Sequence, residues 1–98
     1  MPIRERPERP NDTAETAALQ ALGFVAGDAD RLARFMALAG VSVDELKARA
    51  GDPAFLGGVL DFVLEDEALL LEFCAASGLK PASVARLRAD LPGAPVWE

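Results

Sequence analysis

Two carboxylates four residues apart, Asp61 and Glu65, are the residues whose types and spacing could support chemistry. Side chains at this spacing share one face of a helix, so the acids would form a paired-carboxylate site for a divalent metal or a basic partner. Glu67 and Glu72 would add to the negative field around them. The alternative is the solvated face of an otherwise very apolar helix, because no histidine joins the pair.

The residue types that common catalytic sites need are missing. The chain has no histidine and a single cysteine, Cys74, which excludes Ser-His-Asp and Cys-His pairs, the usual zinc sites and an internal disulfide. Cys74 follows Phe73 in an apolar stretch, so we expect a buried, unreactive thiol. We therefore predict a protein that is not an enzyme, with no catalytic residue and no cofactor.

The charge of the chain argues against broad nucleic-acid binding. Its 98 residues include 10 Lys and Arg against 16 Asp and Glu, which gives a formal charge of −6. Phosphate-binding surfaces need clustered bases, whereas the segment between Arg49 and Lys80 contains acids and no base. The segment 35–49 has the outline of a helix-turn-helix, but its second helix would begin with Asp44 and Glu45. A helix-turn-helix-like nucleic-acid binder stays an alternative, and nucleic acid is not the expected partner.

Start and stop signals divide the chain into five or six short helices that form a compact all-α bundle. Alanine and leucine are abundant, and a hydrophobic content of 51% is sufficient for a packed core. Acidic or hydroxyl residues predict helix starts, and glycines predict helix ends. The predicted N-caps are Asp12, Asp28, Ser42 and Asp52, the predicted ends are Gly27, Gly40, Gly51 and Gly78, and Pro81 opens the last helix.

The segment from Phe55 to Leu64 is apolar nearly all round and should form the central helix. Gly57 and Gly58 within it would permit another helix to cross closely. A second apolar helix follows, but the link Glu65–Glu67 contains no glycine or proline. One long helix over residues 53–77 therefore stays an alternative to two separate helices.

The chain repeats part of its own pattern at a shift of 38 residues. Such an echo predicts two duplicated three-helix units related by a pseudo-twofold axis, in which Asp66 caps a separate helix as Asp28 does. Any chain of short helices joined by turns also echoes itself, so both interpretations stay open. The identical pairs are Leu22 with Leu60, Phe24 with Phe62, Val25 with Val63, Asp28 with Asp66, Leu32 with Leu70, Phe35 with Phe73, Ala37 with Ala75 and Gly40 with Gly78.

The two ends of the chain differ from its helical middle. Residues 1–11 carry three prolines and few apolar residues, which predicts a disordered tail before a single helical domain over residues 12–91. Residues 92–98 form a C-terminal extension with the only tryptophan, Trp97, which we expect to pack back onto the domain. The chain has no apolar run long enough for a membrane span and no signal peptide, so we predict a cytoplasmic location.

Several short motifs carry a family resemblance. They are Ala21–Phe24 followed by Gly27–Asp28, Ala50–Leu56, Leu60–Leu64, Asp66–Leu70 and the terminal Trp97–Glu98. In these motifs the chain resembles a family of small bacterial proteins, the domain of unknown function 3572. The resemblance implies an all-helical single domain in the bacterial cytoplasm, and it brings no activity, cofactor or catalytic residue.

The sequence thus favours a non-enzymatic helical module for protein–protein interaction. The central helices carry more apolar side chains than one small core readily hides, so we expect contact with a protein partner or a second copy, and not with a membrane. A weak carboxylate metal-binding domain is a further alternative. The candidate contact residues are Phe24, Phe62 and Leu71, expected to face outward, together with Asp61 and Glu65.

Overall fold

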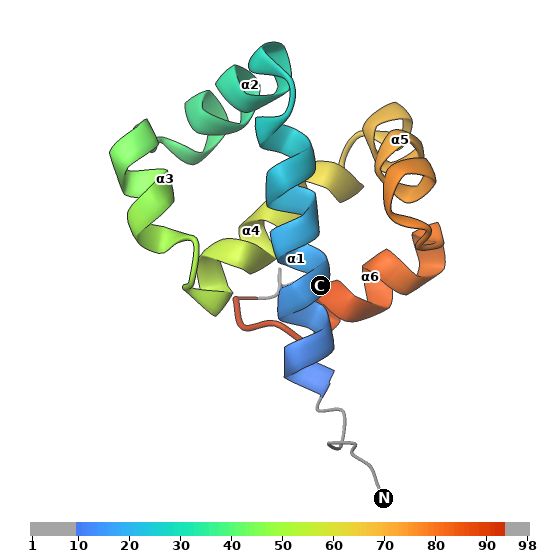
Figure 1. Ribbon diagram of the computed structural model, residues 1–98. Coiled ribbons are helices and arrows are strands. Elements are labelled where there is room, and N and C mark those ends of the chain that lie inside the picture. The colour runs from blue at the N-terminus through green and yellow to red at the C-terminus, as the bar shows by residue number, and fades with distance from the viewer. Residues whose placement is uncertain (1–9, 94–98) are drawn as a thin grey trace, which may run out of the picture.

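The computed structural model describes residues 10–93, with side chains from Ala14 onward. Six helices follow one another along this part of the chain, and they confirm the predicted all-α bundle. In Figure 1, α1 and α4 cross at the centre, α2 and α3 lie on one side, and α5 and α6 lie on the other. α1 and α4 pack against each other, and each also contacts α2 and α5. The helices are α1 (Pro10–Ala26), α2 (Ala29–Ala39), α3 (Val43–Arg49), α4 (Pro53–Leu64), α5 (Glu67–Ser77) and α6 (Pro81–Ala89).

The starts of α3 and α4 form at the predicted caps. Ser42 and Glu45 make a capping box, in which the Glu45 N–H donates to Ser42 Oγ at 3.2 Å and the Ser42 N–H donates to Glu45 Oε1 at 2.9 Å. Asp52 Oδ1 accepts from the Ala54 N–H at 3.1 Å, and Pro53 occupies the first turn. These local hydrogen bonds satisfy amide groups that no helical carbonyl can reach.

α4 and α5 are two separate helices, so the single-helix alternative is wrong. Asp66 has an extended backbone (φ −122°, ψ 108°), and its Oδ1 accepts from the Leu69 N–H at 3.1 Å. Asp28 caps α2 in the same way. Gly40 and Gly78 end α2 and α5 with φ of 70° and 82°, a left-handed conformation that favours glycine.

α1 begins earlier than the sequence predicts. Its described part starts at Pro10, so Asp12 lies inside the first turn and is not the N-cap. Proline is favoured there because its missing N–H would have no helical partner in any case. Pro10 and Asn11, assigned to the tail, therefore belong to the helix, while residues 1–9 and 94–98, including Trp97, lie outside the described residues.

The core gathers around α4, which contributes six buried residues. This confirms its predicted central place. Leu91 follows the end of α6 and is 3% exposed, so the core extends beyond the last helix. The largest fully buried side chains are Val25, Leu56, Val59, Leu60, Val63, Phe73 and Val84.

Within residues 10–93, no single helix has both the length and the apolar character needed to cross a bilayer. α5 and α6 reach that length and composition only together, and they meet at an angle of 97°.

The aromatic contacts follow the 38-residue shift. Phe24 of α1 packs against Phe73 of α5 with ring centroids 5.6 Å apart, and Phe62 of α4 packs against Phe35 of α2 at 5.3 Å. The shift converts Phe24 to Phe62 and Phe35 to Phe73, so each pair becomes the other when the two halves exchange. This reciprocity supports the duplicated-unit interpretation of the echo.

Candidate functional site

An open groove of about 450 Å³ lies between α2 and α4, and we call it groove A. Its floor contains the rings of Phe35, Phe55 and Phe62, of which Phe35 lies 5.8 Å from Phe55 and 5.3 Å from Phe62 in edge-to-face contacts. The remaining lining residues are Leu38, Ala39, Ala54, Gly58, Asp61 and Glu65. Groove A is therefore an apolar concavity with two acids on one wall.

Groove A is open because of two residues on its walls. Leu38 on α2 is 73% exposed, and on α4 a Cβ added at Gly58 would meet nothing within 4 Å. Gly58 was expected to permit a close helix crossing, and this is wrong because none of the six described helices lies against it. The absence of a side chain there leaves the aromatic floor accessible instead.

Asp61 and Glu65 line groove A together, so the prediction that they share one face of α4 is confirmed. Their chemistry differs. Asp61 binds Arg88 through both carboxylate oxygens, with Nε to Oδ1 at 2.7 Å and Nη2 to Oδ2 at 3.0 Å. Glu65 is exposed and has no ion pair within residues 14–93. Asp61 is thus engaged by Arg88 whereas Glu65 is not, and the described residues contain no cluster of three metal-binding side chains.

Arg88 is the buried residue behind this wall, at 5% exposure. Its guanidinium also donates to the backbone carbonyls of Leu91 (3.2 Å), Pro92 (3.2 Å) and Gly93 (2.7 Å). Gly57 leaves room for this arrangement, since a Cβ there would lie 2.6 Å from Arg88 Nη1. No local pattern in the sequence marks Arg88 as a site residue. We call this group the Arg88 cluster: Arg88, Asp61 and the carbonyls of residues 91–93.

A second groove, groove B, of about 350 Å³ lies between α1 and α5. Its lining residues correspond one by one to residues of groove A at the 38-residue shift. The positions that match Asp61 and Glu65 are Gly23 and Gly27, so groove B has no acidic wall. The corresponding pairs are Gln20 with Gly58, Phe24 with Phe62, Phe73 with Phe35, Ala76 with Leu38 and Ser77 with Ala39.

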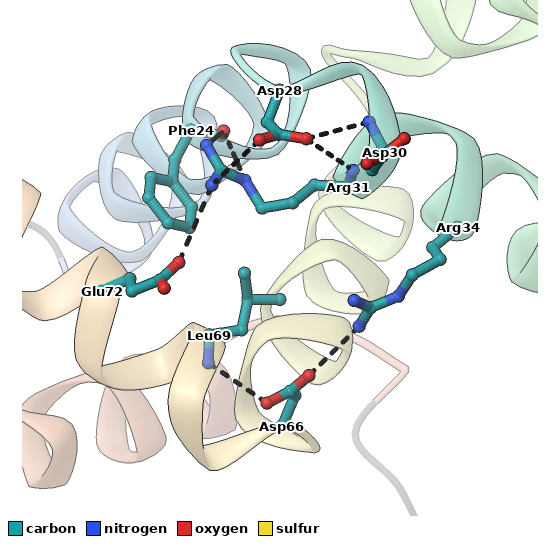
Figure 2. Close-up of polar contacts among 8 residues, drawn as sticks. All are labelled: Phe24, Asp28, Asp30, Arg31, Arg34, Asp66, Leu69 and Glu72. Carbon is teal, nitrogen blue, oxygen red and sulfur yellow. Dashed lines mark hydrogen bonds and ion pairs between the residues drawn. The ribbon is translucent and has the colours of Figure 1, made fainter.

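Arg31 lies against Phe24, which is a lining residue of groove B (Figure 2). Its guanidinium carbon lies 4.0 Å from the centroid of the Phe24 ring, and Nε and Nη2 donate to the Phe24 carbonyl at 3.2 and 2.8 Å. Arg31 Nη1 lies 3.9 Å from Asp28 Oδ2 and 3.7 Å from Glu72 Oε1. Backbone N–H groups of Arg31 and Asp30 hold the pKa of Asp28 below its ordinary value.

A second ion pair joins α2 to the start of α5. Arg34 Nη2 donates to Asp66 Oδ2 at 3.1 Å (Figure 2), and the Arg34 guanidinium carbon lies 5.5 Å from the centroid of the Phe62 ring. The Leu69 N–H, and after it Arg34, lower the pKa of Asp66. Arg34 and Asp66 therefore neutralise each other's charge where α2 meets the start of α5, and their ion pair connects the two helices.

The predicted contact residues divide among these sites. Phe62, Asp61 and Glu65 come together in groove A, and Phe24 lies half-buried in groove B. Phe62 does not face outward as expected, since it is 7% exposed and lines groove A. Leu71 is 52% exposed, as expected, but lines neither groove.

Cys74 is 9% exposed, which confirms its predicted burial. Loss of hydration raises the pKa of its thiol. A high thiol pKa disfavours the reactive thiolate, so Cys74 is a poor nucleophile.

The comparison with known families gives one match. The family model described as "Protein of unknown function (DUF3572)" matches residues 11–94. The chain belongs to the DUF3572 family. This confirms the resemblance drawn from the sequence motifs. No curated protein and no solved structure matches the chain.

Proposed function

We propose that this DUF3572 protein is a non-enzymatic interaction module that binds an amphipathic helix of a basic partner protein in groove A. The observation that carries the proposal is the presence, in one open groove, of three phenylalanine rings, an exposed leucine and a carboxylate, that of Glu65, without an ion pair among the described residues. An amphipathic helix that lays its apolar face into a hydrophobic groove is a recurrent mode of peptide recognition.

The apolar part of groove A supplies the affinity in this proposal. Leu38 exposes 73% of its surface beside the rings of Phe35 and Phe62. Covering it with a helix removes apolar surface from water, which contributes roughly 25 cal/mol per Å² before the costs of association. A buried apolar anchor near the centre of an interface typically carries much of the binding energy.

The charge of groove A selects the partner. Glu65 makes no ion pair with any described residue, and the chain as a whole has a formal charge of −6. A lysine or arginine next to the apolar face of the partner helix would complement Glu65. A second copy of this acidic chain would bring its own carboxylates toward Glu65, so a basic partner is favoured over self-association.

No observation favours the other two candidate functions. Asp61, half of the supposed metal site, already binds Arg88 with both oxygens. The second helix of the supposed nucleic-acid unit, α3, has Asp44 and Glu45 in its first turn, where phosphate would be repelled.

A synthetic peptide helix tests the proposal directly. The probe is an amphipathic peptide with lysines flanking its apolar face, and its control carries glutamates at the same positions. Calorimetric titration should show binding of the lysine peptide only. Leu38→Asp should weaken this binding at least about tenfold, or about 1.4 kcal/mol, because it places a charge at the apolar edge.

Leu71→Asp is the matched control, since Leu71 is also an exposed leucine but lies outside groove A. It should leave the affinity unchanged. Glu65→Lys should reverse the preference between the two peptides. Equal binding by Leu38→Asp and the unmodified protein would contradict the proposal, and sedimentation equilibrium at several concentrations would reveal self-association instead.

A further inference from the structure

The described chain ends beside groove A. A Cβ added at Gly93 would lie 4.0 Å from Cβ of Ala54, and Ala54 is a lining residue of groove A. Five residues, 94–98, follow Gly93 in the sequence, and they include the only tryptophan. The exit point of this segment is therefore adjacent to an apolar groove.

The Arg88 cluster fixes that exit point. Three successive carbonyls, of residues 91 to 93, accept hydrogen bonds from one guanidinium that is 5% exposed. The same guanidinium binds Asp61, and Asp61 lines groove A. One ion pair thus holds both the end of the described chain and a wall of the groove.

The length of the remaining chain suits the groove. Four residues from Gly93 to Trp97 span at most about 14 Å when extended. Along α4, Phe62 lies eight residues after Ala54, or about 12 Å at the rise of an α-helix. The indole of Trp97 can therefore reach the part of the aromatic floor that α4 contributes, from Phe55 to Phe62.

We infer that groove A has an intramolecular occupant, the segment 94–98, whose Trp97 indole docks against the floor formed by Phe35, Phe55 and Phe62. This inference rests on the proposed function and concerns the regulation of the same groove. The segment contains no cation, and Glu98 brings a further negative charge toward Glu65. It therefore satisfies the apolar part of the groove but not its charge, and a basic partner helix displaces it.

Tryptophan fluorescence of the full chain tests the docking, because Trp97 is the only tryptophan and the chain has no tyrosine. We expect blue-shifted emission and weak quenching by acrylamide in the native protein. Gly58→Leu fills groove A at a site where a Cβ meets no atom within 4 Å, so the fold should persist. It should shift the emission to the red and increase the quenching.

Gln20→Leu is the matched control, because Gln20 occupies the position of groove B that corresponds to Gly58. It should leave the emission of Trp97 unchanged. Circular dichroism and the unfolding midpoint establish that both variants are folded. Emission of the native protein equal to that of the unfolded chain would overturn the inference, as would release of Trp97 by Gln20→Leu in place of Gly58→Leu.

Competition separates this inference from the proposed function. When an internal segment occupies the groove for part of the time, the apparent Kd of a partner equals its intrinsic Kd divided by the fraction of molecules whose groove is free. Trp97→Ala should therefore bind the lysine-flanked peptide about threefold or more tightly than the unmodified chain. If the peptide binds groove A but Trp97 is exposed, the inference fails and the proposed function stands. If Trp97 is protected in groove A but no peptide binds, the docking stands and the proposed function fails.

Discussion

Arg88 connects three parts of the molecule through one side chain. It lies on α6, pairs with Asp61 on α4 and holds the carbonyls of residues 91–93. A buried guanidinium loses its hydration, and this cost is offset only when all its donors find partners. Here Nε, Nη1 and Nη2 all find acceptors, so the Arg88 cluster is sensitive to the loss of any member.

Arg88→Met should destabilise the protein by about 2–4 kcal/mol, measured by urea unfolding at pH 7. The substitution leaves the Asp61 carboxylate and three carbonyls without their donor. The expected loss is below that of a fully buried pair because the Asp61 side chain is 29% exposed. Arg86→Met, on the exposed face of the same helix, should change the stability by less than about 0.5 kcal/mol. Similar stabilities of the two variants would contradict this role of Arg88.

The adjacent glycines of α4 should respond to alanine in opposite directions. At Gly57 the new methyl group would lie 2.6 Å from Arg88 Nη1 and 3.0 Å from the Pro92 carbonyl oxygen, so Gly57→Ala should cost about 1–3 kcal/mol. At Gly58 it would meet no atom within 4 Å, and Gly58→Ala should gain about 0.5–1 kcal/mol from the higher helix propensity of alanine. Thermal or urea unfolding measures both, and a change of the same sign would contradict the packing described here.

At this scale the sequence was informative only for neighbours along a helix. The spacing of Asp61 and Glu65 was sufficient to place them on one face of α4, and this was correct. Nothing local connects Asp61 to Arg88, which is 27 residues further along the chain. The same limit applies to Leu38, which reaches groove A only because α2 packs against α4.

At the scale of the elements, most helix boundaries were predictable because the signals are short-range hydrogen bonds. Ser42 with Glu45, and Asp52 with Pro53, act within one turn of the helix that they start. The break before α5 contains no glycine or proline, and its signal was the match of Asp66 with Asp28 in the echo. The predicted start of α1 was wrong because two helix-start signals, Pro10 and Asp12, lie close together. The sequence alone does not show which of them begins the helix.

The cap of α5 should make stability depend on acidic pH. The Leu69 N–H and Arg34 lower the folded-state pKa of Asp66, so the fold favours its ionised form. This contribution is complete above the ordinary Asp pKa of about 3.9 and is lost as the pH falls through the lower folded pKa. Asp66→Ala should therefore lower the unfolding midpoint at pH 7, and its deficit should shrink as the pH falls below the ordinary Asp pKa of about 3.9.

Asp66→Asn separates the two parts of this contribution. Asparagine is also a good N-cap, so it should retain the hydrogen bond from Leu69 and lose the ion pair with Arg34. Its midpoint at pH 7 should lie between those of the unmodified protein and Asp66→Ala. An Asp66→Ala deficit that is equal at pH 7 and at low pH would show that ionisation of Asp66 contributes nothing.

At the scale of the whole molecule, the two halves agree in their first two helices and differ in the third. α6 packs on α1, α4 and α5, whereas its counterpart α3 forms few contacts and has no buried residue. The difference lies in residues that occupy corresponding positions at the 38-residue shift but are not of the same type. The echo was visible in the sequence, but its asymmetry required the packing to be known. The Arg88 cluster, and Gly57 which leaves space for it, have no equivalent in the first half. The corresponding residues there are Ala50 for Arg88, Gly23 for Asp61 and Leu19 for Gly57.

Internal symmetry predicts matched effects in the two aromatic pairs. Phe35 and Phe73 are 3% and 1% exposed. Phe35 packs against Phe62 and Phe73 packs against Phe24, and the 38-residue shift exchanges these two contacts. Phe35→Leu and Phe73→Leu should therefore cost similar amounts, about 1–2 kcal/mol each by urea unfolding. A loss at one position several times that at the other would show that the two environments are not equivalent.

The weak attachment of α3 has a consequence for local opening of the fold. A short helix with no buried residue is held mainly by its capping box and by the half-buried Leu46. Its backbone amides should exchange with deuterium through small openings, long before those of α4, whose exchange requires global unfolding. The turns that flank α3 are thus the places where an epitope or a fluorophore-bearing loop could be inserted with least disturbance to the rest of the fold.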